Sequence, residues 1–195
     1  MTTVANRADD RRKKVVEGAV ALFERDGYHA TNMLGVAEAA GLAKPTLYHY
    51  FTGKQEILFN IHEEFIDLLL AKYESRRGAA LSAAEELRAL MVDTFEVMDT
   101  HRGHIRVFFE NYRELSETDK RTIRSKRDRY QQIVEATLIR GMGNGEFRKL
   151  DPKLTSLALL GMCNWAFHWY QPGGMLTGQE ISSLFFDLAM SGLGE

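Results

Sequence analysis

The segment spanning residues 44–51, KPTLYHYF, gathers side chains that can bind phosphates and base edges. Leu47 and Phe51 lie four residues apart, so on a helix both can face a core and turn their neighbours outward. Hydroxyl and imidazole groups on a short exposed helix can contact phosphates and bases in the major groove of DNA. The outward-facing set consists of Thr46, Tyr48, His49 and Tyr50.

Two short helices joined by a tight turn are predicted to position this segment. An apolar-faced helix that includes Val36 and Ala40 ends at Gly41, because glycine accepts the left-handed conformation of a helix C-terminus. Pro45 fits the first turn of the second helix, where its missing N–H has no partner to lose. The spacing therefore predicts a helix-turn-helix within residues 27–59.

Apolar periodicity along the rest of the chain predicts an all-α protein of nine helices. Ser82 and Glu85 form a capping-box pattern before the fifth helix. Outside the two short helices, the expected helices include residues 8–26, 57–76, 87–98, 104–115, 117–140, 152–169 and 177–192. We expect two functional parts, with residues 1–55 forming the DNA-binding domain and residues 56–195 the ligand-binding and dimerisation domain.

Charge is distributed unevenly along the chain. The formal net charge is −2, which argues against a general polyanion binder. Residues 1–55 nevertheless carry eight Lys and Arg against six Asp and Glu, and Arg11, Arg12, Lys13 and Lys14 form one cluster. This cluster can contact phosphates or the minor groove, or it can be a solvated helix start. The balance fits a small DNA-contacting surface attached to a body that does not bind DNA.

Cysteine usage and hydropathy predict a cytoplasmic protein without a membrane partner. Cys163 is the only cysteine, so no internal disulfide can form and a reducing compartment is expected. The N-terminal residues are polar and basic, unlike a secretion signal. No stretch approaches the roughly 18 apolar residues that a membrane span needs.

One pattern of residue types runs from Gly27 to Lys54. Its members are Gly27, Tyr28, Thr31, Val36, Ala37, Ala40, Gly41, Leu42, Lys44, Thr46, Leu47, Tyr48, Tyr50, Phe51 and Lys54. This pattern resembles the N-terminal DNA-binding domain of TetR-family repressors. Ala43 departs from the pattern, because the family commonly has a serine there that can cap the second helix.

The resemblance implies that the helix carrying Tyr48 enters the major groove and that flanking residues contact phosphates. Thr31 is also expected to cap the first helix of the pair, a role that alone would explain its position. Lys54 is expected to meet a phosphate, because the family places such a contact at the start of the fourth helix. The DNA-contacting residues are then Thr31, Lys44, Pro45, Thr46, Tyr48, His49, Tyr50 and Lys54.

The family also implies a homodimer in which the last two helices of each subunit form a four-helix interface. Two recognition helices would then meet a near-palindromic operator about one helical turn apart, roughly 34–36 Å. An apolar stripe on the last helix fits the interface, although it could equally complete the core of one subunit. Its members are Ile181, Leu184, Phe185 and Leu188.

Large aromatic and methionine side chains are frequent after residue 90. Most can be simple core residues, but together they fit an apolar ligand pocket between helices. Asn164 and His168 lie four residues apart among aromatics, and if buried they need polar partners that a ligand or the core can supply. The candidate ligand-binding residues are Met91, Phe95, Met98, Phe108, Phe109, Tyr112, Asn164, Trp165, His168 and Trp169.

The stretch from Asn164 to Gly174 is similar to the Asn-Trp-x-x-x-Trp-Tyr-x-Pro-x-Gly segment of one TetR branch. That branch represses lipid and steroid catabolism in bacteria, and its members release DNA on binding acyl-CoA thioesters. The resemblance implies a fatty-acyl or steroid-derived CoA thioester as the small-molecule effector, without a further cofactor. Gln171 stands where a basic residue is expected in relatives.

A basic run lies on the predicted seventh helix. It can be a solvated face, as the acidic residues among it favour, or it can meet the phosphates of a CoA ligand. Its members are Lys120, Arg121, Arg124, Lys126, Arg127 and Arg129.

Catalysis is not expected from this sequence. His101 and His104 share a helix face, but no Cys or carboxylate cluster completes a metal site. His62 and Glu63 begin a zinc-protease motif that lacks its second histidine. Two alternatives to a CoA-responsive repressor remain open. One is a repressor of the same fold that senses a free apolar compound and controls efflux, and the other is a helical protein whose helix-turn-helix contacts protein or ligand instead of DNA.

Overall fold

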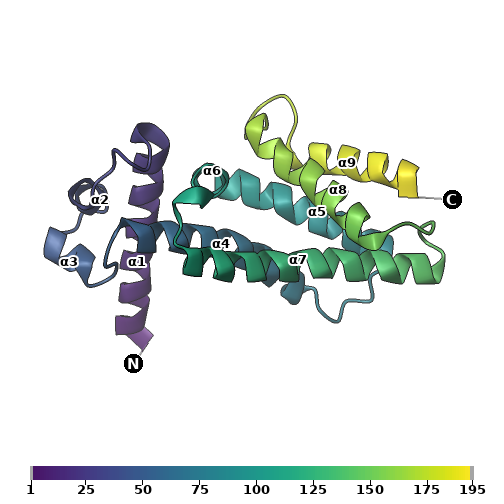
Figure 1. Ribbon diagram of the computed structural model, residues 1–195, viewed down its shortest axis with the longest axis horizontal. Coiled ribbons are helices and arrows are strands. Elements are labelled where there is room, and N and C mark those ends of the chain that lie inside the picture. Colours follow the sequence, from purple (N-terminus) through teal and green to yellow (C-terminus); the bar gives the residue numbers. More distant parts are fainter. Residues whose placement is uncertain (1, 194–195) are drawn as a thin grey trace. The chain divides into compact units, whose positions relative to one another are not determined.

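The computed structural model describes residues 2–193, and describes side chains from Arg7 onward. Every regular element in this range is a helix (Figure 1). The α-helices are α1 (Thr2–Asp26), α2 (Met33–Ala39), α3 (Lys44–Tyr48), α4 (Lys54–Ser75), α5 (Ala83–Thr100), α6 (Arg102–Glu110), α7 (Glu117–Asn144), α8 (Pro152–Trp165) and α9 (Gly178–Leu193). Two 3-10 helices, η1 (Tyr112–Glu114) and η2 (Ala166–His168), follow α6 and α8.

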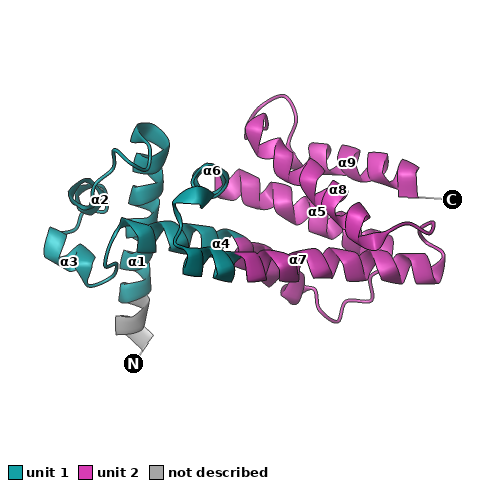
Figure 2. Cartoon of the chain, viewed as in Figure 1, with its two compact units in different colours: residues 1–65, 103–123 teal, residues 66–102, 124–195 magenta. Residues whose placement is uncertain are grey.

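The chain divides into two compact units (Figure 2). Unit 1 comprises residues 1–65 and 103–123, and unit 2 comprises residues 66–102 and 124–195. Unit 1 therefore contains α1 to α3 together with a segment that follows α5 in the sequence. Unit 2 contains α5, α8 and α9.

The core of unit 1 forms on the apolar stripe of α1. Val16, Val20 and Phe23 are spaced four and three residues apart and are all buried. Val36 of α2 and Leu47 of α3 are both fully buried. The helix-turn-helix therefore takes its stability from apolar burial, because helices as short as α2 and α3 are not stable alone.

The ends of α2 and α3 follow the local sequence as expected. Gly41 has a φ of 65°, the left-handed conformation that a side chain would strain. Pro45 lies in the first turn of α3. Ala43 occupies the N-cap position of α3 and supplies no side-chain hydrogen bond, as its departure from the family pattern predicts.

Helix α6 approaches α1 closely within unit 1, and the contact depends on Gly103. A Cβ at this position would lie 2.5 Å from Cγ1 of Val20 and 2.6 Å from Oε2 of Glu24. Only glycine therefore fits between the first turn of α6 and α1 without displacing a side chain. Aromatic packing adds to the unit, since the rings of Phe65 and Phe108 lie 4.6 Å apart.

In unit 2, carboxylates satisfy the N–H groups at the start of α5. Ser82 and Glu85 form a complete capping box, as their spacing predicts. The carboxylate of Glu146 also accepts hydrogen bonds from the N–H groups of Ala83 (3.1 Å) and Ala84 (2.9 Å). These backbone hydrogen bonds lower the pKa of Glu146 below its usual range. The start of α5 is thus tied to the turn after α7.

Helices α5 and α9 are in close contact where α9 begins. A Cβ on Gly178 would lie 2.7 Å from Oδ2 of Asp99 and 3.2 Å from Cβ of Phe95. Thr177 caps α9 by accepting a hydrogen bond from the N–H of Glu180, whose carboxylate accepts one from the N–H of Thr177. The first turn of α9 is therefore fixed by a cap and by packing on α5.

The predicted all-α class and the nine α-helices are confirmed within the described residues. Three predicted helices end earlier than expected. The second helix of the helix-turn-helix, predicted over residues 44–51, ends at Tyr48, so His49, Tyr50 and Phe51 lie in the turn that follows it. The one predicted to reach Trp169 ends at Trp165 and continues as η2, and the one predicted to reach Leu115 ends at Glu110 and is followed by η1. Helix ends often tighten into 3-10 turns, and apolar spacing does not distinguish the two.

Candidate nucleic-acid interface

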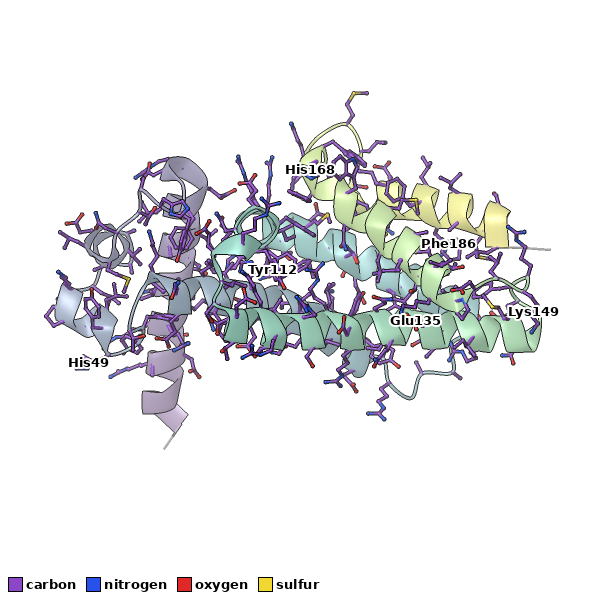
Figure 3. The ribbon with its side chains drawn as sticks, in the orientation of Figure 1. His49, Tyr112, Glu135, Lys149, His168 and Phe186 are labelled. Atoms are coloured by element: carbon purple, nitrogen blue, oxygen red, sulfur yellow. The ribbon has the colours of Figure 1, made fainter. Side chains whose placement is uncertain are left out.

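Helix α3 presents the polar face that its sequence predicts. Leu47 and Phe51 are almost fully buried, so they anchor the helix to the core of unit 1. Tyr48 is 44% exposed, and His49 is exposed as well (Figure 3). Thr46 and Tyr50 are half-buried. The outer side of α3 and of the turn after it therefore combines hydroxyl and imidazole groups.

Lys44 and Pro45 lie at the exposed start of α3. No ion pair joins Lys44 to another residue in the described part of the chain, so its ammonium is open to an anion. Pro45 offers no N–H, but its fixed φ suits the first turn. These two residues extend the exposed face of α3 towards the turn.

The N-cap of α2 is Asn32, and the prediction that Thr31 caps this helix is wrong. The side chain of Asn32 accepts hydrogen bonds from the N–H groups of Leu34 and Gly35, both at 3.0 Å. Thr31 is 5% exposed, and its hydroxyl donates to the carbonyl of Gly27 at 2.9 Å. Threonine and asparagine are both good N-cap residues. Because Thr31 and Asn32 are adjacent, the sequence alone does not decide which of them caps α2.

The ammonium group of Lys54 lies against the turn between α1 and α2. Its Nζ donates to the carbonyls of Tyr28 (2.5 Å), Thr31 (2.8 Å) and His29 (3.3 Å). The same atom lies 4.3 Å from the centroid of the Tyr28 ring. Desolvation lowers the pKa of Lys54. The group expected to meet a phosphate is therefore engaged within unit 1.

Arg12 supports the end of α3, a role that the sequence reasoning missed. Its guanidinium donates to the carbonyl of Tyr50 at 3.0 Å and lies 4.2 Å from the centroid of the Phe51 ring. Glu56 lies 3.9 Å from the same group. Of the basic cluster on α1, Arg11, Lys13 and Lys14 are exposed. The sequence showed only a cluster of four basic residues. It did not show that Arg12, unlike the other three, contacts the end of the helix-turn-helix.

Met91, Phe95 and Met98 of α5 are buried in unit 2, each at most 3% exposed. The ring of Phe95 lies edge-on to Tyr170 at 5.9 Å and to Phe185 at 5.7 Å. Phe95 therefore packs between α5, α9 and the segment after α8, and Met91 and Met98 are buried on the same helix.

The aromatic residues at the end of α8 lie on the surface of the described chain. Trp165 is 63% exposed and Trp169 is 47% exposed, and His168 is exposed between them (Figure 3). The rings of Trp165 and His168 lie 4.1 Å apart. Asn164 is half-buried. A set of stacking surfaces is thus available at this end of α8.

The remaining candidate ligand-binding residues, Phe108, Phe109 and Tyr112, lie in unit 1. Phe108 is 3% exposed, and its ring lies 5.0 Å from that of the buried His62. Phe109 and Tyr112 are half-buried. Of the ten candidates, three thus lie in unit 1 and seven in unit 2.

A buried ion pair joins α5 to the segment after α4 in unit 2. Asp93 is 4% exposed, and its carboxylate accepts a hydrogen bond from the guanidinium of Arg76 at 2.6 Å. Nearby, Tyr130 donates to the carbonyl of Leu90, and burial raises the pKa of its hydroxyl. Burial also raises the pKa of the Cys163 thiol to about 12.

Two cations of the basic run on α7 are paired with carboxylates of α4 in unit 2. Lys126 lies 2.7 Å from Asp67, and Arg129 lies 3.1 Å from Glu74. Arg124 and Arg127 are exposed. The positive charge of the run is thereby partly balanced.

Helices α8 and α9 expose apolar side chains at helical spacing. On α8, Leu154 is 66% and Leu157 is 47% exposed, and on α9 Leu184 is 60% and Leu188 is 62% exposed. Ile181 is 4% exposed, so this member of the predicted stripe packs into its own unit. Phe185 is half-buried. Exposed leucines on two successive helices are typical of an interface.

Two family models match most of this chain. Residues 80–193 match a model described as the tetracyclin repressor-like C-terminal domain, which alone spans more than half of the chain. Residues 15–61 match the model of bacterial regulatory proteins of the tetR family, in the segment that contains α2 and α3. The protein belongs to the TetR family. The resemblance found in the sequence is thereby confirmed.

Several TetR-family proteins are similar over nearly the whole chain. The HTH-type transcriptional repressor KstR2 of Mycobacterium tuberculosis is 26% identical, covering 99% of this chain and 98% of KstR2. Its structure, described as a ketosteroid transcriptional regulator, has a TM-score of 0.85 over 95% of each chain. PfmR from Thermus thermophilus is 31% identical, with a TM-score of 0.85 over 93% of this chain and 99% of PfmR.

A third TetR-family structure, AibR in complex with isovaleryl coenzyme A and operator DNA, is 25% identical. Its TM-score is 0.80 over 91% of this chain and 97% of AibR. These relatives are regulatory proteins. Over residues 2–193, no group of His, Cys, Asp and Glu is arranged to hold a metal ion. No helix in that range is long and apolar enough to cross a membrane.

Proposed function

We propose that this TetR-family protein is a dimeric, ligand-responsive transcriptional repressor. It binds a near-palindromic operator, and a fatty-acyl or steroid-derived CoA thioester releases it. It thereby controls genes of lipid or steroid catabolism. Residues 1–55 serve DNA binding, and residues 56–195 serve sensing and dimerisation.

The exposed face of α3 carries the DNA-binding part of this proposal. Tyr48 at the end of α3 and His49 directly after it are exposed, and the buried Leu47 and Phe51 fix this segment to the core. Lys44 adds an exposed ammonium at the start of the helix. Such a helix fits the major groove, where hydroxyl and imidazole groups meet phosphates and base edges.

The leucines on α8 and α9 support a homodimer. Leu154, Leu157, Leu184 and Leu188 are each about half exposed or more. Burying these leucines against a second copy of the chain removes apolar area from water, which stabilises the dimer by roughly 25 cal/mol per Å² of buried apolar area. Four helices, two from each subunit, form this interface.

The effector proposal rests on the last residues of α8, on the segment after it and on two relatives. Trp165 and Trp169 are exposed, so they can stack on a ligand, and Asn164 and His168 add polar groups. KstR2 is a ketosteroid regulator, and AibR has been seen with isovaleryl coenzyme A and operator DNA. An acyl-CoA ligand would combine an apolar part with an adenine ring suited to stacking.

A free apolar compound is the second candidate for the effector. The ion pairs of Lys126 with Asp67 and of Arg129 with Glu74 favour it, because they leave fewer cations on α7 for the phosphates of CoA. Control of an efflux gene would accompany such an effector.

One titration tests the proposal and separates these candidates. Fluorescence anisotropy measures binding of the protein to DNA from upstream of its own gene, at fixed physiological salt. The complex is then titrated with a long-chain or steroid-acid CoA thioester and, separately, with the matching free acid. Trp165→Ala is titrated in parallel.

Release by the thioester alone is the expected result, and Trp165→Ala should bind DNA normally but resist release. Release by the free acid would support the second candidate. A protein that binds DNA tightly and ignores both ligands would remain a DNA-binding regulator without the proposed effector. A protein that does not bind DNA would indicate that the helix-turn-helix contacts protein or ligand.

A further inference from the structure

The three N–H groups of the Lys54 ammonium match three acceptors inside unit 1. The carbonyls of Tyr28, His29 and Thr31 lie 2.5, 3.3 and 2.8 Å from Nζ. An ammonium has three donors and no acceptor. The ring of Tyr28 adds a cation–π contact, with Nζ at 4.3 Å from its centroid. The ammonium therefore has no donor left for a phosphate.

These carbonyls belong to the turn that leads from α1 into α2. The carbonyl of Thr31 is next to Asn32, whose side chain caps α2. Tyr28 is 6% exposed and packs edge-on against Phe23 of α1 at 5.1 Å. Through Lys54, the first residue of α4 thus holds the turn and the position from which α2 starts.

We infer that Lys54 is a positioning residue for DNA binding, which holds the α1–α2 turn and the start of α2 in place and makes no phosphate contact. This inference rests on the proposed DNA-binding function. It replaces the role expected for Lys54 from the family pattern. Lys44 differs from Lys54, because its side chain is exposed and no ion pair within the described residues holds it.

The salt dependence of DNA binding distinguishes the two roles. Each phosphate contact contributes about 0.9 to the slope of log K against log salt on double-stranded DNA, or about 1.8 for a dimer. Loss of a phosphate contact therefore lowers the slope. Loss of a positioning residue weakens binding but leaves the slope unchanged.

Lys54→Met removes the ammonium and keeps the length of the side chain, and Lys44→Met is the matched control. Operator affinity is measured for both between about 50 and 200 mM salt, well below the melting temperature of each variant. We expect Lys54→Met to bind about tenfold more weakly, which corresponds to about 1.4 kcal/mol, with the wild-type slope. Lys44→Met should lower the slope.

A lower slope for Lys54→Met would overturn the inference in favour of a phosphate contact. Unchanged affinity together with a lower melting temperature would overturn it in favour of a purely structural role. A wild-type protein that fails to bind any operator would remove the proposed function, and the inference with it. That outcome is separate from the other two, because it appears before any variant is made.

A measurement on the wild-type protein covers the case in which Lys54→Met does not fold. Proton–nitrogen spectra of the lysine ammonium groups report whether their protons are held from water. The Lys54 signal, assigned with Lys54→Arg, should be visible in the free protein and unmoved on addition of operator, whereas the Lys44 signal should shift. A Lys54 signal that appears or shifts only with DNA would overturn the inference.

Discussion

The hydroxyl of Tyr170 donates a hydrogen bond to the carboxylate of Asp99, which joins the end of α5 to the segment between η2 and α9. Gly178, the first residue of α9, packs against the same carboxylate. The direction in which α9 leaves this corner decides where Leu184 and Leu188 are presented. Three residues thus position the proposed dimer interface without belonging to it.

Gly178→Val should destabilise the protein. The added Cβ would lie 2.7 Å from Oδ2 of Asp99 and 3.2 Å from Cβ of Phe95, so either the Asp99 carboxylate must leave its place beside Tyr170 or α9 must shift away from α5. Overpacking of this kind costs about 1–3 kcal/mol, which urea unfolding measures directly. Gly192→Ala, at the far end of α9 where nothing lies within 4 Å, is the control and should be neutral or slightly stabilising. Equal stability of the two variants would contradict the close approach.

Tyr170→Phe should change how stability depends on pH. Burial, followed by the hydrogen bond to Asp99, raises the pKa of Tyr170 to about 12. In the unfolded chain a tyrosine has a pKa of about 10. Below that pH the neutral Tyr170 hydroxyl makes its full contribution to the free energy of unfolding. This contribution is lost as the pH rises through about 12.

The variant should lose about 1 kcal/mol at neutral pH, the usual net worth of one hydrogen bond. Between about pH 10 and 12 its unfolding free energy should fall less steeply than that of the wild type. Urea unfolding at a series of pH values measures both. Parallel curves for the two proteins would show that the Tyr170 hydroxyl has no raised pKa.

Leu188→Glu should shift the protein from dimer to monomer. The side chain is 62% exposed in one subunit, so the subunit itself should keep its melting temperature. Placing a charge in a buried interface should raise the dimer dissociation constant about 30-fold or more. Sedimentation velocity over a range of concentrations measures the change. Gln179→Glu adds the same charge elsewhere on α9 and should remain dimeric, whereas a dimeric Leu188→Glu would place the interface elsewhere.

Tyr48→Ala should weaken operator binding without unfolding the protein. Because the side chain is 44% exposed, its loss should leave the melting temperature nearly unchanged and cost about 1–3 kcal/mol of binding. Its neighbour Leu47 is fully buried, so Leu47→Ala should instead lower the unfolding free energy by about 2–5 kcal/mol. Anisotropy and thermal unfolding separate the two effects. Wild-type affinity in Tyr48→Ala would exclude α3 as the reading helix.

The helix-turn-helix could be predicted because its signals are local. The left-handed φ of Gly41 and the place of Pro45 each depend on the residue itself and its nearest neighbours. The burial of Leu47 and Phe51 follows from their spacing alone. Such features are determined by a few adjacent residues, so a single sequence carries them.

Features that depend on distant residues were harder to predict. Lys54 donates hydrogen bonds to carbonyls 23 to 26 positions earlier in the chain. Helical periodicity does not predict contacts over such a sequence separation. The α9 stripe indicated one apolar face, but only packing shows that Ile181 is buried and Leu184 exposed.

The buried thiol of Cys163 can be used to measure how often the structure around α8 opens locally. Burial raises the pKa of the Cys163 thiol to about 12, so the thiol is protonated at neutral pH, and the residue is only 2% exposed. An alkylating reagent can therefore modify the native chain only when α8 separates from its neighbours. The rate at which the thiol is labelled, with and without a bound effector, therefore measures how often this part of the protein opens. No probe has to be engineered into the chain.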